Sequence, residues 1–510
     1  MRLLKSLLLA SAAGLLAVSA AQAADIPTKK AAPVAPKPNC YASFYTWLDS
    51  TAADCPLSAF GITVYGTVDM GGGYNSHAAK FNDNFPNGIQ EKVSKDSNDG
   101  KWQKVPNGLS QSNIGVKIKE QVVPSWYVIG DVNFGFDPYS LKAANGPASL
   151  VDNNLISSTR QDLISANGDS SRNGKLDNTR AYVGVSNATY GTLTFGRQYS
   201  LTNDLSGAYD PFGGAYAFSL IGTSGTVEQG TGETETARYN ESFKYLLTYN
   251  NLRASTIVQV GGWQQGNGAK DAFQIGVGGD YAGFSLDAIY AYAKDAVNLG
   301  TWGSITTTPA APWTPESLKA TIADVNAAVV GLKYKWDKLT LFSGYEYAKL
   351  SAPSDFGSAG SDIVVGRYYT FNGGYPAQIQ KNAFVDPEHL QVIWLGAKYG
   401  VLSNLDAAVG YYYEWQNNYT AIGTATATQA YTTACAANTT AAAPGATPQG
   451  ANHGSCSGHT DVVSAMLDWR PVKRVDVYGG VMYSHVTGGM ANGYIHDSNT
   501  SFTSGVRVNF

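Results

Sequence analysis

The chain has 510 residues, with 35 basic and 39 acidic side chains and a formal net charge of −4. This mild acidity has the wrong sign for a nucleic-acid-binding protein, so we exclude that class of partner. After the N-terminal segment no run of roughly 18 apolar residues occurs, which excludes membrane-spanning helices. The 32 Tyr, 10 Trp and 56 Gly predict strands and turns instead. This composition suits a bilayer interface or a large soluble β-protein.

The N-terminus predicts export from the cytoplasm. Arg2 and Lys5 precede an apolar stretch at 7–18, and an Ala-Gln-Ala cleavage site ends at Ala23. This pattern is typical of a secretory signal peptide over residues 1–23. An exported chain without helical spans is periplasmic, secreted or a β-barrel. Residues 24–60 begin with a Pro- and Lys-rich stretch, and we interpret them as a periplasmic leader.

Four cysteines form two local pairs in the sequence, Cys40 with Cys55 and Cys435 with Cys456. In an oxidising compartment an even number of cysteines at short spacing predicts disulfides. His453, Cys456 and His459 could instead form a metal cluster. We favour the disulfides, and predict no metal site and no cofactor, because an exported thiol with a nearby partner is usually oxidised.

Apolar and polar residues alternate with a period of two from Gly61 onwards, as expected of strands with one apolar face. Clear examples occupy residues 61–70, 114–119, 126–136, 181–195 and 475–483. Short turns follow every second strand, and long polar segments separate the pairs. The longest of these segments are 75–109, 138–178, 200–237, 295–327, 351–388 and 417–460.

This alternation of short turns and long loops predicts an all-β protein, a transmembrane antiparallel β-barrel over residues 61–510 with long external loops. We count about sixteen strands, an even number as in single-chain bacterial barrels. A soluble sandwich has no reason for a two-sided distribution of loop lengths. The first strand should pair with the last, because an open edge in hydrocarbon leaves backbone groups unsatisfied. The polar inner face predicts a water-filled lumen.

The final strand has outward residues Phe502, Val506 and Val508 and ends at Phe510. It resembles the closing strand of outer-membrane barrels. In those proteins the terminal aromatic residue is the signal that the assembly machinery recognises. The resemblance predicts a lipid-facing strand that closes the barrel and gives Phe510 the role of assembly signal.

Three motifs in order carry a more specific resemblance: TLTFGRQ at 192–198, DPFGG at 210–214 and RYNES at 238–242. Together with the signal peptide, the stretch 167–172 and the N-terminal cysteine pair, they resemble alphaproteobacterial porins of the trimeric general-diffusion type. In such porins a third loop folds into the barrel between these motifs, here residues 200–237. The resemblance implies a passive water-filled channel for ions and small hydrophilic solutes. It also implies a homotrimer embedded in the lipid of a Gram-negative outer membrane.

The resemblance further implies a pore constriction in which basic wall residues face acidic residues of the inserted loop. Arg180 and Arg238 take the wall positions, and Arg197 lies at the start of the loop. Asp204 and Asp210 occupy the loop segment expected to face them. The family often has an arginine at the start of the second strand, where this chain has Ser-Asn-Ile at 112–114, and Lys117 is one candidate to replace that charge.

Other functions lack sequence support. The six histidines are scattered, and neither an HExxH nor a GxSxG motif is present, so we predict no enzyme. The segment 96–100 resembles part of a calcium loop without its later Glu ligand. A substrate-selective channel, a gated transporter, a barrel enzyme and an adhesin are the alternatives. A gated transporter is disfavoured because residues 24–60 are too few for a plug domain.

Overall fold

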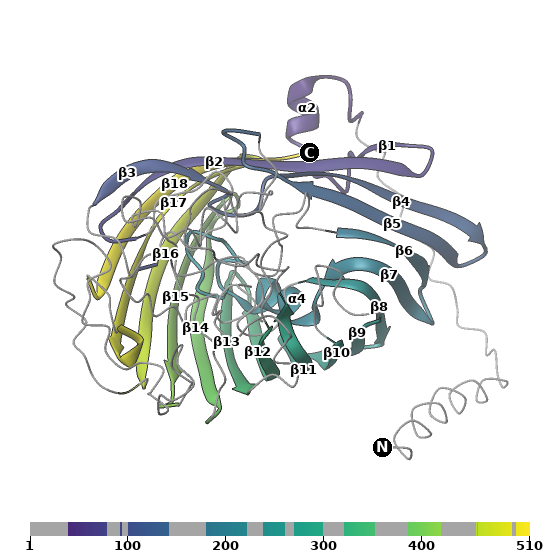
Figure 1. Ribbon diagram of the computed structural model, residues 1–510. Coiled ribbons are helices and arrows are strands. Elements are labelled where there is room, and N and C mark those ends of the chain that lie inside the picture. Colours follow the sequence, from purple (N-terminus) through teal and green to yellow (C-terminus); the bar gives the residue numbers. More distant parts are fainter. Residues whose placement is uncertain are drawn as a thin grey trace, which may run out of the picture.

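The computed structural model describes residues 39–78, 92–93, 100–141, 180–221, 238–260, 270–298, 321–351, 386–419, 455, 457–491 and 496–510. These residues form one 18-stranded sheet, in which two short strands accompany a closed antiparallel ring of sixteen. Figure 1 shows the ring as a wide barrel with α4 in its interior and α2 outside one end. The predicted fold class and strand number are confirmed.

The strands of the ring follow one another in chain order, each antiparallel to its neighbours. They are β2 (Ile62–Asn75), β4 (Asn113–Val123), β5 (Trp126–Gly135), β6 (Arg180–Asn187), β7 (Gly191–Tyr199), β8 (Arg238–Tyr249), β9 (Leu252–Gln259), β10 (Lys270–Tyr281), β11 (Phe284–Asn298), β12 (Thr321–Trp336), β13 (Leu339–Ser351), β14 (Glu388–Leu402), β15 (Leu405–Gln416), β16 (Gly458–Val472), β17 (Val475–Gly488) and β18 (Ser498–Asn509). The short strands are β1 (Leu57–Ala59) and β3 (Lys101–Pro106), and η4 (Gly489–Ala491) is a single 3₁₀ turn.

The first and last strands of the ring close the barrel. β18 pairs with β2 from Ser501 opposite Asn75 to Asn509 opposite Thr67. The terminal residue continues this ladder, because the amide of Phe510 donates to the carbonyl oxygen of Gly66 at 2.9 Å and the Gly66 amide donates back at 3.0 Å. No backbone edge is left open along this stretch, as a wall in hydrocarbon requires.

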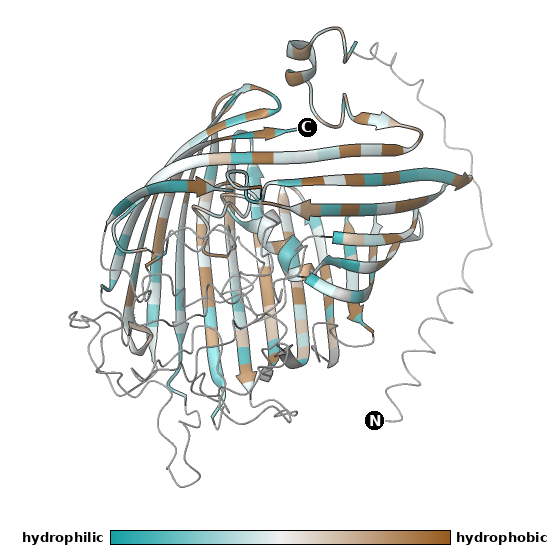
Figure 2. Cartoon of the chain, turned by 45° about the horizontal axis from the view of Figure 1, so that its top comes forward, coloured by the Kyte–Doolittle hydropathy of each residue, from teal (hydrophilic) through white to brown (hydrophobic). Residues whose placement is uncertain are grey.

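The two faces of the wall differ as the alternation predicts. On β18, Phe502 and Val506 point outward and are exposed, whereas Ser501 and Thr503 point inward and are buried. Figure 2 shows bands of opposite hydropathy along most strands. Outward side chains of this kind are suited to lipid, and inward polar ones to water.

The strands are joined at one end of the barrel by tight turns, which we call the short-turn end. Two-residue connections at Asn250-Asn251, Ala282-Gly283 and Asp337-Lys338 link directly paired residues, as predicted. Their first residues have φ near +50°, the left-handed conformation that matches the twist of a hairpin. The opposite end carries the long connections, and we call it the long-loop end.

A disulfide-closed segment covers the short-turn end next to the seam between β18 and β2. It contains α2 (Phe44–Leu48), whose first turn is capped by the Ser43 hydroxyl accepting from the Thr46 amide at 3.1 Å. β1 then pairs with the start of β2, beyond the point where β18 ends. We call residues 39–59 the N-terminal cap.

Arg474, in the turn between β16 and β17, fixes this cap to the barrel. Its guanidinium donates to the carbonyl oxygens of Trp47, Thr51 and Cys55 at 2.9, 3.1 and 2.6 Å. It also lies 4.3 Å from the centre of the Trp47 ring. Burial lowers the pKa of Arg474 below the ordinary arginine value. In the described part of the chain, no helix has the length and apolarity needed to span a bilayer.

Candidate pore constriction

The chain leaves the wall after β7 and enters the lumen as α4 (Leu201–Tyr209). Ser200 caps the helix, its hydroxyl accepting from the Asn203 amide at 3.2 Å. Gln274 on β10 accepts from the amides of Leu201 and Thr202 at 2.7 and 3.2 Å. A side chain of a wall strand three places further round the ring thus satisfies backbone donors that a helix start leaves without intrahelical partners. The start of the inserted loop is therefore held in one position.

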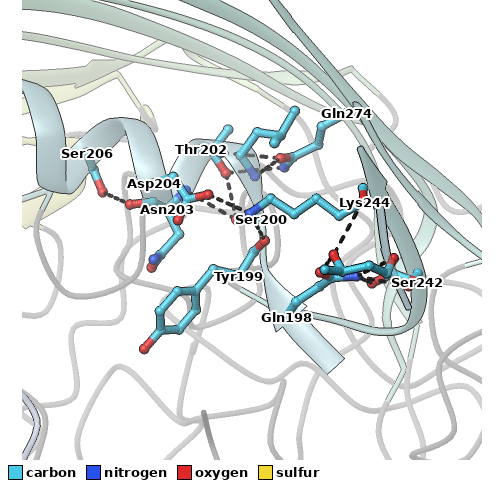
Figure 3. A network of polar contacts seen from close by, with 12 residues as sticks. Gln198, Tyr199, Ser200, Thr202, Asn203, Asp204, Ser206, Ser242, Lys244 and Gln274 are labelled. Atoms are coloured by element: carbon cyan, nitrogen blue, oxygen red, sulfur yellow. Dashed lines mark hydrogen bonds and ion pairs between the residues drawn. The ribbon is translucent and has the colours of Figure 1, made fainter. Parts of the chain in front are cut away.

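Lys244 on β8 holds the same junction by its charge. Its ammonium donates to the Tyr199 carbonyl oxygen at 2.9 Å and forms an ion pair with Asp204 at 2.5 Å. Figure 3 shows Lys244 reaching to Tyr199 and Asp204, with Gln198 bonded to Ser242 below. The Lys244 side chain is only 8% exposed, whereas that of Asp204 is 48% exposed. The predicted loop carboxylate therefore faces water but already has a partner.

The end of α4 is bonded to strands further round the barrel. The Tyr209 hydroxyl donates to Asp287 at 2.5 Å, and the Trp394 indole donates to the Tyr209 carbonyl oxygen at 3.0 Å. Burial and the bond to Asp287 raise the pKa of Tyr209 to about 12, so the phenol stays protonated as a donor at neutral pH. Together with Gln274, these contacts hold α4 against β10, β11 and β14.

Asp210 has a different place from the one expected. Its carboxylate is 2% exposed and accepts from the amides of Phe212 and Gly214, both at 2.9 Å. Hydroxyl donors come from Ser219 at 3.0 Å and from Tyr412. Burial raises the pKa of Asp210, and these four donors act in the opposite direction. Asp210 therefore fixes the DPFGG turn to the wall, and the expectation that it faces the basic wall residues across water is corrected.

Arg180 belongs to a polar cluster on the inner wall. Its guanidinium lies 3.2 Å from the Asp131 carboxylate and donates to the Tyr65 hydroxyl at 3.1 Å. The Tyr65 hydroxyl in turn donates to Asp131 at 2.5 Å. The exposed Lys117 lies 4.2 Å from the centre of the Tyr65 ring, on the lumen-facing side of β4. The structure thus brings Lys117 and Arg180 together around Tyr65.

Arg238 starts β8 on the other side of Tyr199. The guanidinium carbons of Arg238 and Arg180 lie 4.9 and 4.7 Å from the centre of the Tyr199 ring. The two expected wall arginines are therefore neighbours through one aromatic residue. Arg197 is half-buried at a β-bulge, where Gly196 has a φ of +133°. Its role at the start of the loop stays a prediction.

A cavity of about 380 Å³ lies between the inserted loop and the wall. Its charged lining consists of Arg238, Lys398, Asp468 and Arg507. Three of these have partners nearby: Lys398 pairs with Asp406 at 3.2 Å, Arg507 with Asp476 at 2.9 Å, and Asp468 with Arg470 at 2.9 Å. The lining also includes the backbone of Gly213 and Gly214 and the polar side chains of Ser110, Gln111, Asn113, Tyr199, Asn203 and Tyr216.

Sequence reasoning missed several residues that line this cavity or hold the inserted loop beside it. Lys244, Lys398, Asp468 and Arg507 are inward-facing strand residues, so the alternation marks their face but not their height in the barrel. The segment 107–112 is held in the lumen by Asp69, which accepts from the amides of Leu109 and Ser110 at 2.7 and 3.0 Å and from the Tyr478 hydroxyl at 2.7 Å. Nothing local in the sequence predicts this contact.

Of the two predicted disulfides, one is confirmed and the other falls outside the described residues. Cys40 and Cys55 are joined by a disulfide, with Cα atoms 5.4 Å apart. Cys435 and Cys456 lie outside the described residues, as do the signal peptide and His453. His459 contacts Asp461 at 3.2 Å and Thr487. Among the residues described, no group of three or more His, Cys, Asp or Glu side chains could hold a metal ion.

Comparisons with known proteins agree with this architecture. Residues 10–375 match the family of Gram-negative porins. An outer membrane porin protein of Bordetella pertussis is 23% identical over 322 residues, which cover 63% of this chain and 62% of that protein. The match thus spans less than two thirds of the relative.

Two solved structures have a similar fold. An anion-selective porin from Comamonas acidovorans has a TM-score of 0.51 at 13% identity, covering 88% of this chain and 99% of that one. A loop-deletion mutant of OmpT, an outer membrane protein of Vibrio cholerae, has a TM-score of 0.50 at 15% identity, with the same coverage. The closed sixteen-stranded ring and the family match over most of the sequence lead to one conclusion: this chain belongs to the family of Gram-negative porins and is an outer-membrane β-barrel.

Proposed function

We propose that the protein is a passive, water-filled channel through which ions and small hydrophilic solutes cross the outer membrane. The observation that carries this proposal is the inserted loop. It is fixed at both ends of α4 to the inner wall and leaves a cavity of about 380 Å³ lined by charged and polar groups. A lumen narrowed in this way passes solutes by size and charge and needs no chemical step.

The charges around the loop give the channel its selectivity. Arg180 and Arg238 lie on the wall at Tyr199, and Lys117 adds a cation on the lumen-facing side of β4. Asp204 supplies the exposed carboxylate of the loop, in place of the buried Asp210. Fixed charges of opposite sign across a narrow aqueous neck order water and orient dipolar solutes, which retards apolar ones.

We also propose that three copies assemble into a homotrimer. β6 and β9 have 8 residues each and β7 has 9, whereas β12 has 16. A tilted strand needs about 9–11 residues to cross the hydrocarbon core. This short part of the wall carries outward apolar residues such as Val183 and Phe195, which a second copy would cover. The mass of the unheated, detergent-solubilised protein tests this: three chains are expected, and a single chain would refute it.

The remaining features follow from the family resemblance. The fold and the family favour a channel over an enzyme. We place the short-turn end in the periplasm, with residues 24–60 as a periplasmic segment after the signal peptide 1–23, and residues 61–510 as the barrel. An alphaproteobacterial source fits the order of the loop motifs. A substrate-selective channel is the second candidate, and the observation that favours it is the charge of Arg238, which has no ion pair with any residue that the structure describes.

Conductance of the pure protein in a planar bilayer tests the proposal. We expect ohmic current, and a barrel without conductance would refute the channel function. The double variant Arg180→Ala, Arg238→Ala removes two positive charges and two bulky side chains from the neck. It should conduct more and shift the reversal potential towards cations in a salt gradient. Lys119→Ala removes a lumen-facing cation that lies beside Tyr127 and outside the cavity, and serves as the matched control.

The salt dependence of this shift distinguishes charge from size. Exposed charges are screened over about 10 Å at 0.1 M salt and about 3 Å at 1 M. The change in reversal potential should therefore shrink as ionic strength rises, while the gain in conductance from the lost side chains should persist. A double variant with wild-type conductance and reversal potential at low salt would show that the two arginines do not face the pore.

A further inference from the structure

Arg238 differs in its charge balance from four other arginines of the inner wall. Arg180, Arg253, Arg470 and Arg507 each lie within 3.2 Å of at least one carboxylate. Among the described residues, Arg238 has no ion pair, and its Nε atom is buried without a hydrogen-bond partner. The residue is only 5% exposed and contacts Tyr199 through its guanidinium.

Within the described part of the chain, this arrangement leaves the buried positive charge of Arg238 without a counter-charge. Contact with an aromatic ring offsets only part of the free energy that removing a cation from water costs. In proteins a buried cation is usually paired with a carboxylate, which offsets this cost. Here Asp131 forms an ion pair with Arg180 on one side of Tyr199. On the other side, no described carboxylate forms an ion pair with Arg238.

The cavity lets a counter-charge come from the pore fluid. Arg238 lines it, together with Lys398 on β14 and Arg507 on β18. In the ring, β8 is the sixth strand and β16, which carries Asp468, the fourteenth, so residues from opposite sides of the barrel meet here. A volume of about 380 Å³ corresponds to roughly a dozen water molecules at about 30 Å³ each. A small solute with part of its hydration shell fits this space.

We propose that this cavity is a binding subsite for small solutes that carry an oxyanion group, such as a carboxylate or a phosphate. Arg238 provides a charge that no described carboxylate neutralises, and guanidinium groups bind such oxygens through charge-assisted hydrogen bonds. Lys398 adds a second cation: its side chain is 38% exposed, and Asp406, its partner, is shared with Arg470. The subsite rests on the proposed channel function and gives it a preferred class of solute.

Concentration-dependent block of single-channel current tests the subsite. The trimer in a planar bilayer at constant ionic strength receives malonate in one arm and inorganic phosphate in the other, with chloride as the background anion. Both should interrupt the wild-type current at concentrations where added chloride does not. In Arg238→Gln the half-blocking concentration should rise about tenfold or more, because a hydrogen bond to a charged group contributes about 1.5–3 kcal/mol.

Three further variants separate the effect of the subsite from a general change in pore charge or a failure to fold. Lys119→Gln carries the same change of charge outside the cavity and should leave the block unchanged. Arg238→Lys keeps the charge without the planar fork and should give an intermediate block. If Arg238→Gln does not fold, Lys398→Gln replaces it and should weaken block by a smaller factor.

The two proposals fail in different ways. Absence of any current refutes the channel function. Normal current that neither malonate nor phosphate blocks refutes the subsite alone. Equal block in wild type and in the substituted channel likewise shows that the anions act elsewhere in the pore.

Discussion

Replacing Asp210 with Ala should detach the DPFGG turn from the barrel wall while leaving the barrel folded. The substitution removes the acceptor of two backbone amides, those of Phe212 and Gly214, at a buried position. A buried donor that loses its partner costs about 1–3 kcal/mol, so the two together cost about 2–6 kcal/mol. Both residues line the cavity, which lets water reach them, and we take the lower end.

A loss of about 2 kcal/mol raises the population of the detached turn roughly 25-fold. Single-channel recording should show this as larger current fluctuations and a higher mean conductance than in wild type. The control is Asp210→Asn, because an amide can accept from the two backbone donors and donate to the hydroxyls of Ser219 and Tyr412. Asp210→Ala channels as quiet as wild type, or Asp210→Asn channels as noisy as Asp210→Ala, would refute this account of the turn.

The acid response of the same turn has a definite sign. The pKa of Asp210 is raised in the folded protein, so the folded state binds this proton more tightly than the unfolded state does. Stability linked to this group therefore increases as the pH falls through the raised pKa, and is lost as the pH rises. Acidification from pH 7 to pH 5 should therefore lower the current noise or leave it as it is, and should not raise it. An increase confined to wild type and absent in Asp210→Asn would contradict the assignment.

Other predictions concern assembly and the ends of the chain. Val506→Asp should reduce or abolish folded, heat-modifiable protein, because a charge on the lipid face costs up to a few kcal/mol near the midplane, and deletion of Phe510 should do the same; normal folding of either variant would contradict the assignment of that face. Mass spectrometry without reductant should show Cys435 bonded to Cys456, and free thiols would exclude the bridge. Arg474→Ala should make the N-terminal cap sensitive to protease while heat-modifiability persists, and an equally resistant cap would show that other contacts hold it.

The sequence predicted those parts of the structure that depend on local patterns. Alternation with a period of two identified the outward face of β18 through Phe502 and Val506, because each residue's side follows from its neighbours alone. The hairpin at Ala282-Gly283 followed from turn chemistry. The Cys40–Cys55 disulfide followed from spacing and compartment. In each case the information lies within about fifteen residues.

The site was harder to predict because its contacts join distant strands. Asp210 meets Tyr412, 202 residues away, and Tyr209 meets Trp394, 185 residues away. Strand periodicity shows that a residue points inward, but which inward residues share a height depends on the stagger of the whole ring. The constriction roles of Arg180 and Arg238 came from the family resemblance and stay predictions. The same resemblance placed Asp210 opposite them, where the structure has it buried, and no sequence pattern pointed to Lys244 as the partner of Asp204.

The attachment of the N-terminal cap has a consequence for the order of folding. The cap is synthesised first, and its fifteen-residue disulfide loop can close by itself. Its docking site is made last, because Arg474 bonds both to the cap and, through its carbonyl oxygen, to the amide of Asn509. The cap therefore cannot dock until residues more than 400 positions later in the chain have been synthesised. The stacking of Trp47 on Arg474 therefore reports that the cap has docked on the β16–β17 turn, and a change in Trp47 fluorescence would time that event.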